Sequence, residues 1–216
     1  MRRIGGKPSR GNRDGAIRLT NMNVQTIFAT LSAVIGISSF VPYLRDIFRL
    51  KTTPHSYSWL IWGLLQGTGA LAMISSGASW GAASVTIGAF LCTSVFLLSL
   101  RYGTKNITLF DTVCFIGALL ATAVWFSLHD ALLAIVLVSL IDLLAFLPTF
   151  RKAYAEPYSE TTLTYVLSGI ADGLAILALG TFSVTTSLYL FTLVVTNFAC
   201  AGILWLRRAR LWSQAN

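Results

Sequence analysis

The chain has 216 residues, of which 55% are hydrophobic and 11% are charged, whereas a soluble domain carries about 25% charged residues. So small a polar fraction excludes a soluble globular domain, and so apolar a composition excludes a disordered chain. The net charge of +8 does not indicate a nucleic-acid partner, because the basic residues stand at the ends of apolar segments. The composition predicts an all-α, polytopic membrane protein.

The apolar pattern predicts seven transmembrane helices, each near the roughly 20 residues that a helix needs to cross the hydrocarbon core. In chain order they cover residues 24–49, 57–76, 80–100, 108–127, 131–150, 163–180 and 185–206. The connections between the second and third, the fourth and fifth, and the sixth and seventh helices are short and carry no lysine or arginine.

Lysine and arginine gather instead in the other three connections and in the C-terminal tail. These ten residues are Arg45, Arg49, Lys51, Arg101, Lys105, Arg151, Lys152, Arg207, Arg208 and Arg210. Since short cytoplasmic connections are enriched in basic residues, we expect the C-terminus in the cytoplasm. With seven spans, the N-terminus then lies outside.

Residues 1–21 oppose this rule, because they hold six basic residues on the expected outer side: Arg2, Arg3, Lys7, Arg10, Arg13 and Arg18. Either this tail is short enough to be translocated, or the protein starts at Met22, directly before the first helix. We favour the start at Met22, and in both cases we expect the tail to be disordered. The tail does not resemble a cleaved signal peptide, since it has no apolar stretch of its own.

An internal repeat with an offset of 106 residues runs through the chain without a gap. The segment FVPYLR at 40–45 aligns with FLPTFR at 146–151, so that Pro42 falls on Pro148. The other matches are Gly63 with Gly169, Gly67 with Gly173, and Arg101 with Arg207. The repeat covers the first three and the last three helices. An odd linker helix restores the chain direction, so the repeat predicts two parallel bundles in a 3+1+3 arrangement, a plan that transporters use.

The predicted organisation follows from this repeat. It comprises a basic tail at 1–21, a first triple-helix bundle at 22–104, a linker helix at 105–129, a second triple-helix bundle at 130–207 and a cytoplasmic tail at 208–216.

These motifs resemble the SWEET and PQ-loop superfamily over about residues 24–207. In each half a proline precedes a basic connection, and Ser or Thr and an aromatic residue open the next helix, as in VPYLRDIFRLKTTPHSYSW and LPTFRKAYAEPYSETTLTY. Tyr43 and Thr149 replace the glutamine that often follows the proline, so the chain looks closer to the sugar-transporter branch and to bacterial relatives. The resemblance implies an outside N-terminus, a bacterial inner membrane and transport of a small solute by alternating access.

Polar side chains at membrane depth are costly, so each one is a candidate functional residue. The repeat aligns Gln66 with Asp172, both near the centres of their helices, and Asn197 stands near the middle of the seventh helix. We predict these three residues, with Trp59 and Trp62, as the substrate site. The two tryptophans are alternatively interfacial belt anchors.

The resemblance implies that an asparagine holds sugar at the position of Asn197. The repeat partner of Asn197 is Leu91, which cannot do so, and Thr93 is the nearest substitute. This departure weighs against a sugar as the substrate.

Asp142 and Asp172 are the candidates for proton coupling, because an apolar environment disfavours the charged carboxylate and favours the protonated form. They are alternatively structural carboxyl groups. Pro42 and Pro148 leave a helix carbonyl without a donor, which predicts a hinge or a fixed kink in each bundle.

No metal-ligand spacing, phosphate-binding loop or nucleophile motif occurs in the sequence, so we expect neither an enzyme nor a cofactor. Cys92, Cys114 and Cys200 fall inside apolar segments and are interpreted as small core residues. The predicted function is a membrane transporter of a sugar-like or amino-acid-like solute, with that solute and the lipid bilayer as its partners. The alternative is a receptor or accessory protein of the same fold that binds a ligand without moving it. The sequence leaves the oligomeric state open.

Overall fold

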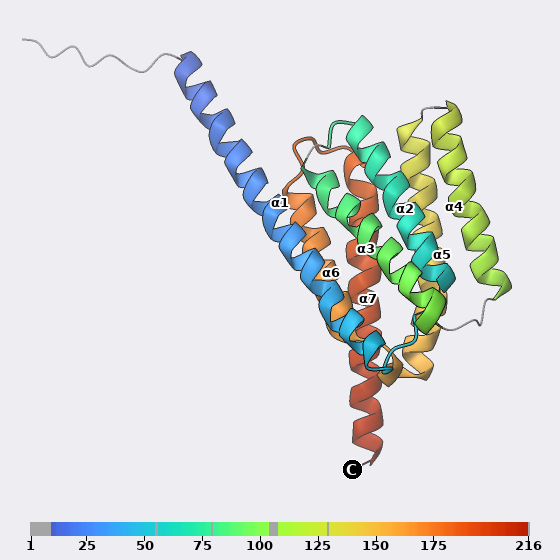
Figure 1. Cartoon of the computed structure of the whole chain (residues 1–216). Coiled ribbons are helices and arrows are strands. Elements are labelled where there is room, and N and C mark those ends of the chain that lie inside the picture. The colour runs from blue at the N-terminus through green and yellow to red at the C-terminus, as the bar shows by residue number, and fades with distance from the viewer. Residues whose placement is uncertain (1–9, 55, 79, 104–107, 129, 216) are drawn as a thin grey trace, which may run out of the picture.

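The computed structural model of the chain describes residues 10–54, 56–78, 80–103, 108–128 and 130–215 (Figure 1), and the side chains of 10–23, 111, 114, 125, 128, 148 and 215 lie outside this description. All regular secondary structure in the described residues is helical. The helices are α1 (Arg10–Phe48), α2 (Ser56–Ser75), α3 (Gly81–Tyr102), α4 (Leu109–Leu128), α5 (Ala131–Ala155), the 3-10 turn η1 (Pro157–Ser159), α6 (Thr162–Leu177) and α7 (Val184–Ala215). The all-α prediction is confirmed.

The predicted helix positions agree with the structure within a few residues, except at three ends where the helices are longer. Helix α1 begins at Arg10, so residues 10–21 are helical and not disordered as expected, while residues 1–9 lie outside the described part. Helix α5 continues to Ala155, and α7 runs through the predicted tail to Ala215. Once an apolar segment has formed a helix, each further residue adds a hydrogen bond without the cost of nucleation, so polar flanks extend it.

Four helices are long and apolar enough to cross a membrane. These segments are Val24–Phe48, Gly81–Tyr102, Ala131–Ala155 and Val184–Gln214. Helix α6 has 16 residues and is therefore about 24 Å long at 1.5 Å per residue, less than the roughly 30 Å of a hydrocarbon core. Large apolar side chains such as Phe90 and Val195 are exposed on the outer faces. Both findings indicate an integral membrane protein.

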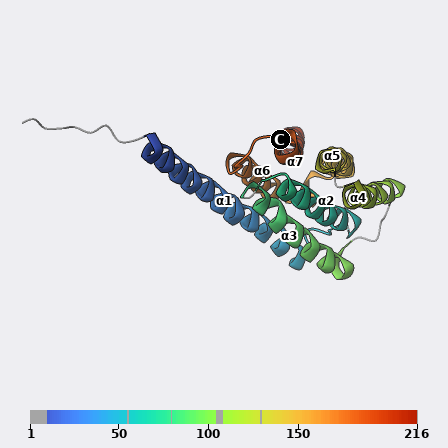
Figure 2. The ribbon, with the colours of Figure 1, turned by 90° about the horizontal axis from the view of Figure 1, so that it is seen from above.

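The helices pack as two groups of three with α4 at the edge. In the first group α3 packs against both α1 and α2, and in the second group α7 packs against both α5 and α6. The two groups meet along α1 and α6 and along α2 and α5, while α4 packs on α5 and α2. Seen from above, α6, α7 and α5 form one row that faces α1, α3 and α2 (Figure 2).

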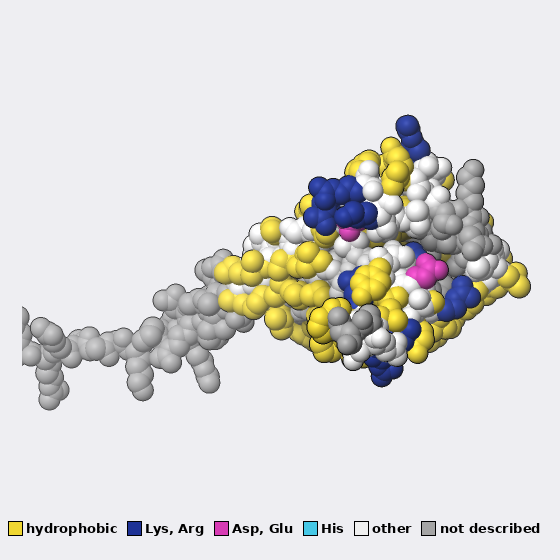
Figure 3. Space-filling model, turned by 90° about the horizontal axis from the view of Figure 1, so that it is seen from below, with side chains coloured by type: hydrophobic (Ala, Val, Ile, Leu, Met, Phe, Trp, Pro, Cys, Tyr) yellow, Lys and Arg dark blue, Asp and Glu magenta, His cyan; other side chains and the backbone are white. Residues whose placement is uncertain are grey.

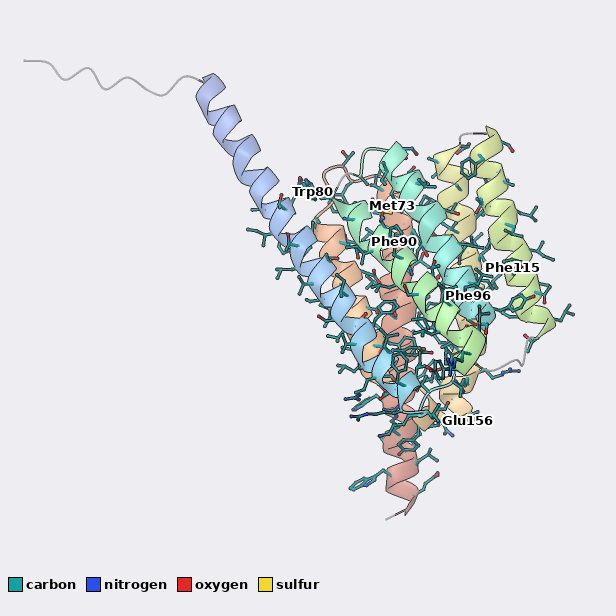
Figure 4. All side chains as sticks on the ribbon, viewed as in Figure 1. Met73, Trp80, Phe90, Phe96, Phe115 and Glu156 are labelled. Carbon is teal, nitrogen blue, oxygen red and sulfur yellow. The ribbon has the colours of Figure 1, made fainter. Side chains whose placement is uncertain are left out.

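The chain direction alternates from helix to helix, so that α1, α3, α5 and α7 all end at the lower end in Figure 1. This lower end, here called the basic end, carries nine of the ten basic residues singled out above, while Lys105 lies outside the described part. Figure 3 shows lysine and arginine side chains spread over it. Glu156 lies at this end and Trp80 lies towards the opposite, far end (Figure 4).

Glycines allow close helix packing within both groups. A Cβ atom at Gly63 would lie 3.0 Å from a side chain of α3, and one at Gly169 would lie 3.0 Å from a ring of α7. Around Gly67 and Gly173, in contrast, a Cβ atom would meet nothing within 4 Å. The small residues therefore bring helices together at the first pair of matching glycines and not at the second.

Candidate functional site

A cavity lies between the two groups, with about 80 Å³ of space open to water-sized molecules. A single water needs roughly 10–15 Å³ on this measure, so the cavity holds several waters or a small solute. Its lining residues come from α1, α2 and α3 on one side and from α5, α6 and α7 on the other. The helix α4 contributes none of them.

Most of this lining consists of residue pairs that are 106 positions apart in the sequence. The pairs are Gly36 with Asp142, Phe40 with Phe146, Trp59 with Tyr165, Trp62 with Ser168, Gln66 with Asp172, Ile87 with Leu193, and Leu91 with Asn197. Matching positions of the two halves therefore face one shared space. The side chains within a pair differ, so the two walls of the cavity are not chemically equivalent.

Gln66 reaches into the cavity from α2 towards α3. Its Nε2 atom donates to the Cys92 Sγ atom at 3.1 Å. Gly88, one helical turn before Cys92, makes this position possible, because a Cβ atom there would collide with the Gln66 side-chain oxygen. Neither Gly88 nor Cys92 was recognised as a site residue from the sequence, since the repeat gives them no polar partner.

Asp172 of α6 and Asn197 of α7 lie next to each other in the opposite wall. The Asn197 Nδ2 atom donates to the Leu193 carbonyl at 2.9 Å and to the Asp172 Oδ2 atom at 3.4 Å. Both side chains are buried. The structure thus brings together all three polar residues that the sequence singled out, Gln66 on one wall and this pair on the other.

Asp142 of α5 completes the acidic side of the cavity. It is fully buried, and neither carboxyl oxygen has a hydrogen-bond donor within the described part of the chain. The Thr196 hydroxyl lies close enough to interact with Asp142, but it donates to the Thr192 carbonyl at 3.0 Å. Asp142 therefore lines the cavity without a fixed partner.

Aromatic rings form the wall of the cavity on the side of the basic end. The ring centroids of Trp59 and Trp62 lie 5.2 Å apart, those of Trp62 and Phe146 also 5.2 Å, and those of Phe40 and Trp59 5.8 Å. Both tryptophans are less than 10% exposed, so the alternative of an interfacial belt anchor is wrong for them. The Trp59 Nε1 atom donates to Tyr43, whereas the buried Trp62 Nε1 atom finds no acceptor among the described residues.

Hydrogen bonds join the two groups between the aromatic wall and the basic end. The Thr161 hydroxyl donates to the Asp46 Oδ2 atom at 2.9 Å and lies 3.4 Å from the Thr52 hydroxyl. These contacts run from the connection after α1 to the residue that precedes α6. They close the basic end of the cavity in this conformation.

A buried carboxylate holds the second group together at the same end. Glu160 accepts a hydrogen bond from Lys152 Nζ and another from the Tyr165 hydroxyl, each at 3.0 Å. Arg208 of α7 donates to the carbonyl oxygens of Pro157 and Glu160 at 2.6 and 2.7 Å. This set of residues is called the Glu160 cluster below, and it gives two of the basic residues a structural role that topology alone does not explain.

Other candidates from the sequence lie elsewhere or outside the description. Thr93 is exposed on the outer face of α3 and donates to the Ala89 carbonyl, so it is no substitute for the amide missing at Leu91. Pro42 lies within helical α1, and Pro148 lies within α5 while its side chain is outside the described residues. Their role as hinges stays a prediction.

The sequence interpretation missed several hydroxyl groups in the cavity wall. Ser168 donates to Ser39 at 3.0 Å across the boundary between the two groups. Tyr165 also lines the cavity. The signal was available in both α6 positions, because Ser168 and Tyr165 are the repeat partners of Trp62 and Trp59.

The chemistry of this site is that of a small-molecule binding cavity. Within the described residues no three potential metal ligands gather in one place. Two carboxyl groups, two amides, several hydroxyls and a wall of aromatic rings instead surround a space of solute size. Compared with protein-family models, with curated proteins and with solved structures, the chain matches none of them.

Proposed function

We propose that the protein is a membrane transporter that moves a small polar solute, sugar-like or amino-acid-like, by alternating access between two three-helix bundles. The first bundle is α1 to α3, the second is α5 to α7, and α4 is the linker. The observation that carries this proposal is the cavity between the two groups, because its walls come from matching positions of an internal repeat. Transporters built from parallel repeats bind their substrate at such an interface.

The packing of the helices supports the 3+1+3 arrangement. The third helix of each group lies between the other two, and the contacts between the groups obey the same exchange, α1 with α6 and α2 with α5. Exchanging the first group for the second leaves this pattern unchanged, as expected for two copies of one bundle around a shared axis. The alternating chain direction in Figure 1 gives both groups the same sense.

The proposed orientation follows from the basic end. Lysine and arginine are enriched in short connections on the cytoplasmic side, and they gather here at the ends of α1, α3, α5 and α7. In the proposed topology the basic end and the C-terminus are cytoplasmic and the N-terminus lies outside. The membrane would be the inner membrane of a bacterium, as the family resemblance implies.

In the proposed mechanism, Gln66, Asp172 and Asn197 bind the solute and the aromatic wall packs against it. Opening towards the cytoplasm requires the Thr161–Asp46 hydrogen bond to break, because this bond joins the two bundles below the cavity. Pro42 and Pro148 would allow the first helix of each bundle to bend. Asp142 and Asp172 are positioned to exchange a proton with the cavity.

The test is solute flux through the purified full-length protein in liposomes, measured with labelled sugars and amino acids. Gln66→Leu and Asp172→Leu should each reduce uptake at least tenfold, because each removes a polar group from the cavity wall. Thr93→Val is the matched control, since Thr93 lies on the outer face, and it should keep uptake within twofold of the unmodified protein.

Two results would contradict the proposal. If a solute binds but never crosses the bilayer, the protein is a receptor or an accessory protein. If Gln66→Leu and Asp172→Leu leave both binding and flux unchanged, the cavity is not the substrate site.

A further inference from the structure

The two walls of the cavity differ in charge. Both carboxyl groups, Asp142 and Asp172, belong to the second group. Their repeat partners in the first group are the uncharged Gly36 and Gln66, and no lysine or arginine is among the lining residues in the described part of the chain. The cavity therefore has one acidic wall without a basic side chain to balance it.

Asp142 makes this imbalance acute. Asp172 accepts a hydrogen bond from Asn197, but the two oxygens of the fully buried Asp142 accept none from the described residues. A buried carboxylate without a donor or counter-ion costs several kcal/mol. It is stable only with a bound proton or with a cation from outside the chain.

The rest of the cavity suits a cation of one particular kind. Trp59, Trp62, Phe40 and Phe146 line it with their rings. Ring faces attract organic ammonium groups, tryptophan most strongly, and the attraction grows when the site excludes water. A bare metal ion would need several oxygen ligands, whereas an alkylammonium group needs one carboxylate and a set of rings.

We infer that the cavity binds a small organic cation, a protonated amine or quaternary ammonium compound, with Asp142 as its counter-ion and the tryptophan-rich wall around its alkyl groups. This inference rests on the proposed function, since it names the substrate class of that same site. The unpaired Trp62 Nε1 atom is a donor for an oxygen atom on the same ligand, such as a hydroxyl group.

The cation and a proton then compete for one carboxyl group. The ionisable groups that act on Asp142 are Asp172 of α6, Cys92 of α3 and Tyr189 of α7, while α2, η1 and the described side chains of α4 contribute no charged group. Since none of these neighbours is a cation, a bound ammonium group must neutralise Asp142 itself. Binding should weaken as the pH falls.

The probe pair for the test is choline and its uncharged carbon isostere 3,3-dimethyl-1-butanol, which differ in the charge of the central atom and share the hydroxyl group. Binding is measured on the purified full-length protein by the ligand-induced rise in unfolding temperature. Choline should bind at least tenfold more tightly than the isostere. Asp142→Asn should remove this preference, and Asp142→Glu should retain it.

Asp130→Asn is the matched control, because Asp130 is exposed at the start of the same helix. It should leave the preference for choline unchanged. The unfolding temperature of each variant without ligand shows whether it is folded. If Asp142→Asn does not fold, the pH dependence of choline binding to the unmodified protein decides, since competition with a proton predicts weaker binding at lower pH.

The failures of the two proposals are distinguishable by adding liposome flux of labelled choline. Choline that binds but does not cross the bilayer supports the inference and contradicts the transport function. Labelled neutral solutes that cross while choline neither binds nor crosses support transport and overturn the inference. Equal binding of choline and its isostere, or a preference that survives in Asp142→Asn, also overturns it.

Discussion

Replacement of Glu160 tests whether the Glu160 cluster stabilises the fold. The Glu160 side chain is 7% exposed, its partner Lys152 is 34% exposed, and the Tyr165 hydroxyl donates to the other carboxylate oxygen. Glu160→Ala removes the acceptor for both donors. Glu160→Gln retains an oxygen acceptor for Tyr165 but removes the negative charge that faces Lys152.

The magnitudes follow from these two contacts. The ion pair contributes about 1–2 kcal/mol, because one partner is buried and the other is partly screened by solvent. A buried tyrosine hydroxyl without an acceptor costs about 1–3 kcal/mol more. Glu160→Ala should therefore lower the free energy of unfolding by about 3 kcal/mol and Glu160→Gln by about 1–2 kcal/mol. For a chain of this size, about 2–4 °C per kcal/mol converts these values into roughly 6–12 °C and 2–8 °C.

The assay is thermal unfolding in detergent, followed by tryptophan fluorescence. Glu156→Ala is the matched control: Glu156 is exposed at the end of α5, four residues from Glu160, and its replacement should shift the unfolding temperature by about 1 °C or less, since exposed positions rarely matter. Equal shifts for Glu160→Ala and Glu156→Ala would refute the reasoning. So would a Glu160→Gln variant as unstable as Glu160→Ala, because the Tyr165 hydrogen bond would then have no effect.

Two further predictions concern the cavity wall. Gly88→Ala should reduce solute flux about fivefold, equivalent to roughly 1 kcal/mol for one hydrogen bond, because the new methyl group displaces the Gln66 side chain from Cys92; Gly67→Ala, which meets nothing within 4 Å, should leave flux unchanged, and equal effects of both would count against the site. In a chain with Cys92 as its sole native cysteine, a cationic thiol reagent should react faster than an anionic one of the same size, relative to the ratio at an exposed Thr53→Cys reference. A ratio no higher at Cys92 than at the reference would contradict an acidic cavity.

The fold was predictable where periodicity and the repeat act over long segments. Apolar stretches of about 20 residues specify helices almost independently of their neighbours, which is why α2, α3 and α4 begin and end close to the predicted residues. The ends of α1, α5 and α7 were not predictable in this way. They continue through polar residues whose helical state depends on the preceding segment and, in α7, on arginine contacts with the η1 turn.

The candidate site was predictable only in part. The repeat offset placed Gln66 and Asp172 at equivalent positions, and both line the cavity. Gly88 escaped notice because its role is to leave room for another side chain, and this depends on how closely α2 approaches α3. The lack of a partner for Asp142 is likewise a property of the packed structure, since no sequence pattern reports which donors fail to reach a carboxyl group.

Helix α7 joins two places that are distant along the membrane normal. Asn197 lies in the cavity wall and Arg208 holds the η1 turn, eleven residues further on, which is about 16 Å along a helix. If α7 tilts as a stiff rod about Asn197 by about 10°, Arg208 sweeps through roughly 3 Å, enough to break hydrogen bonds of ordinary length. The helix therefore acts as a lever: a ligand that reorients α7 at Asn197 also sets whether the arginine anchor on the cytoplasmic side stays engaged.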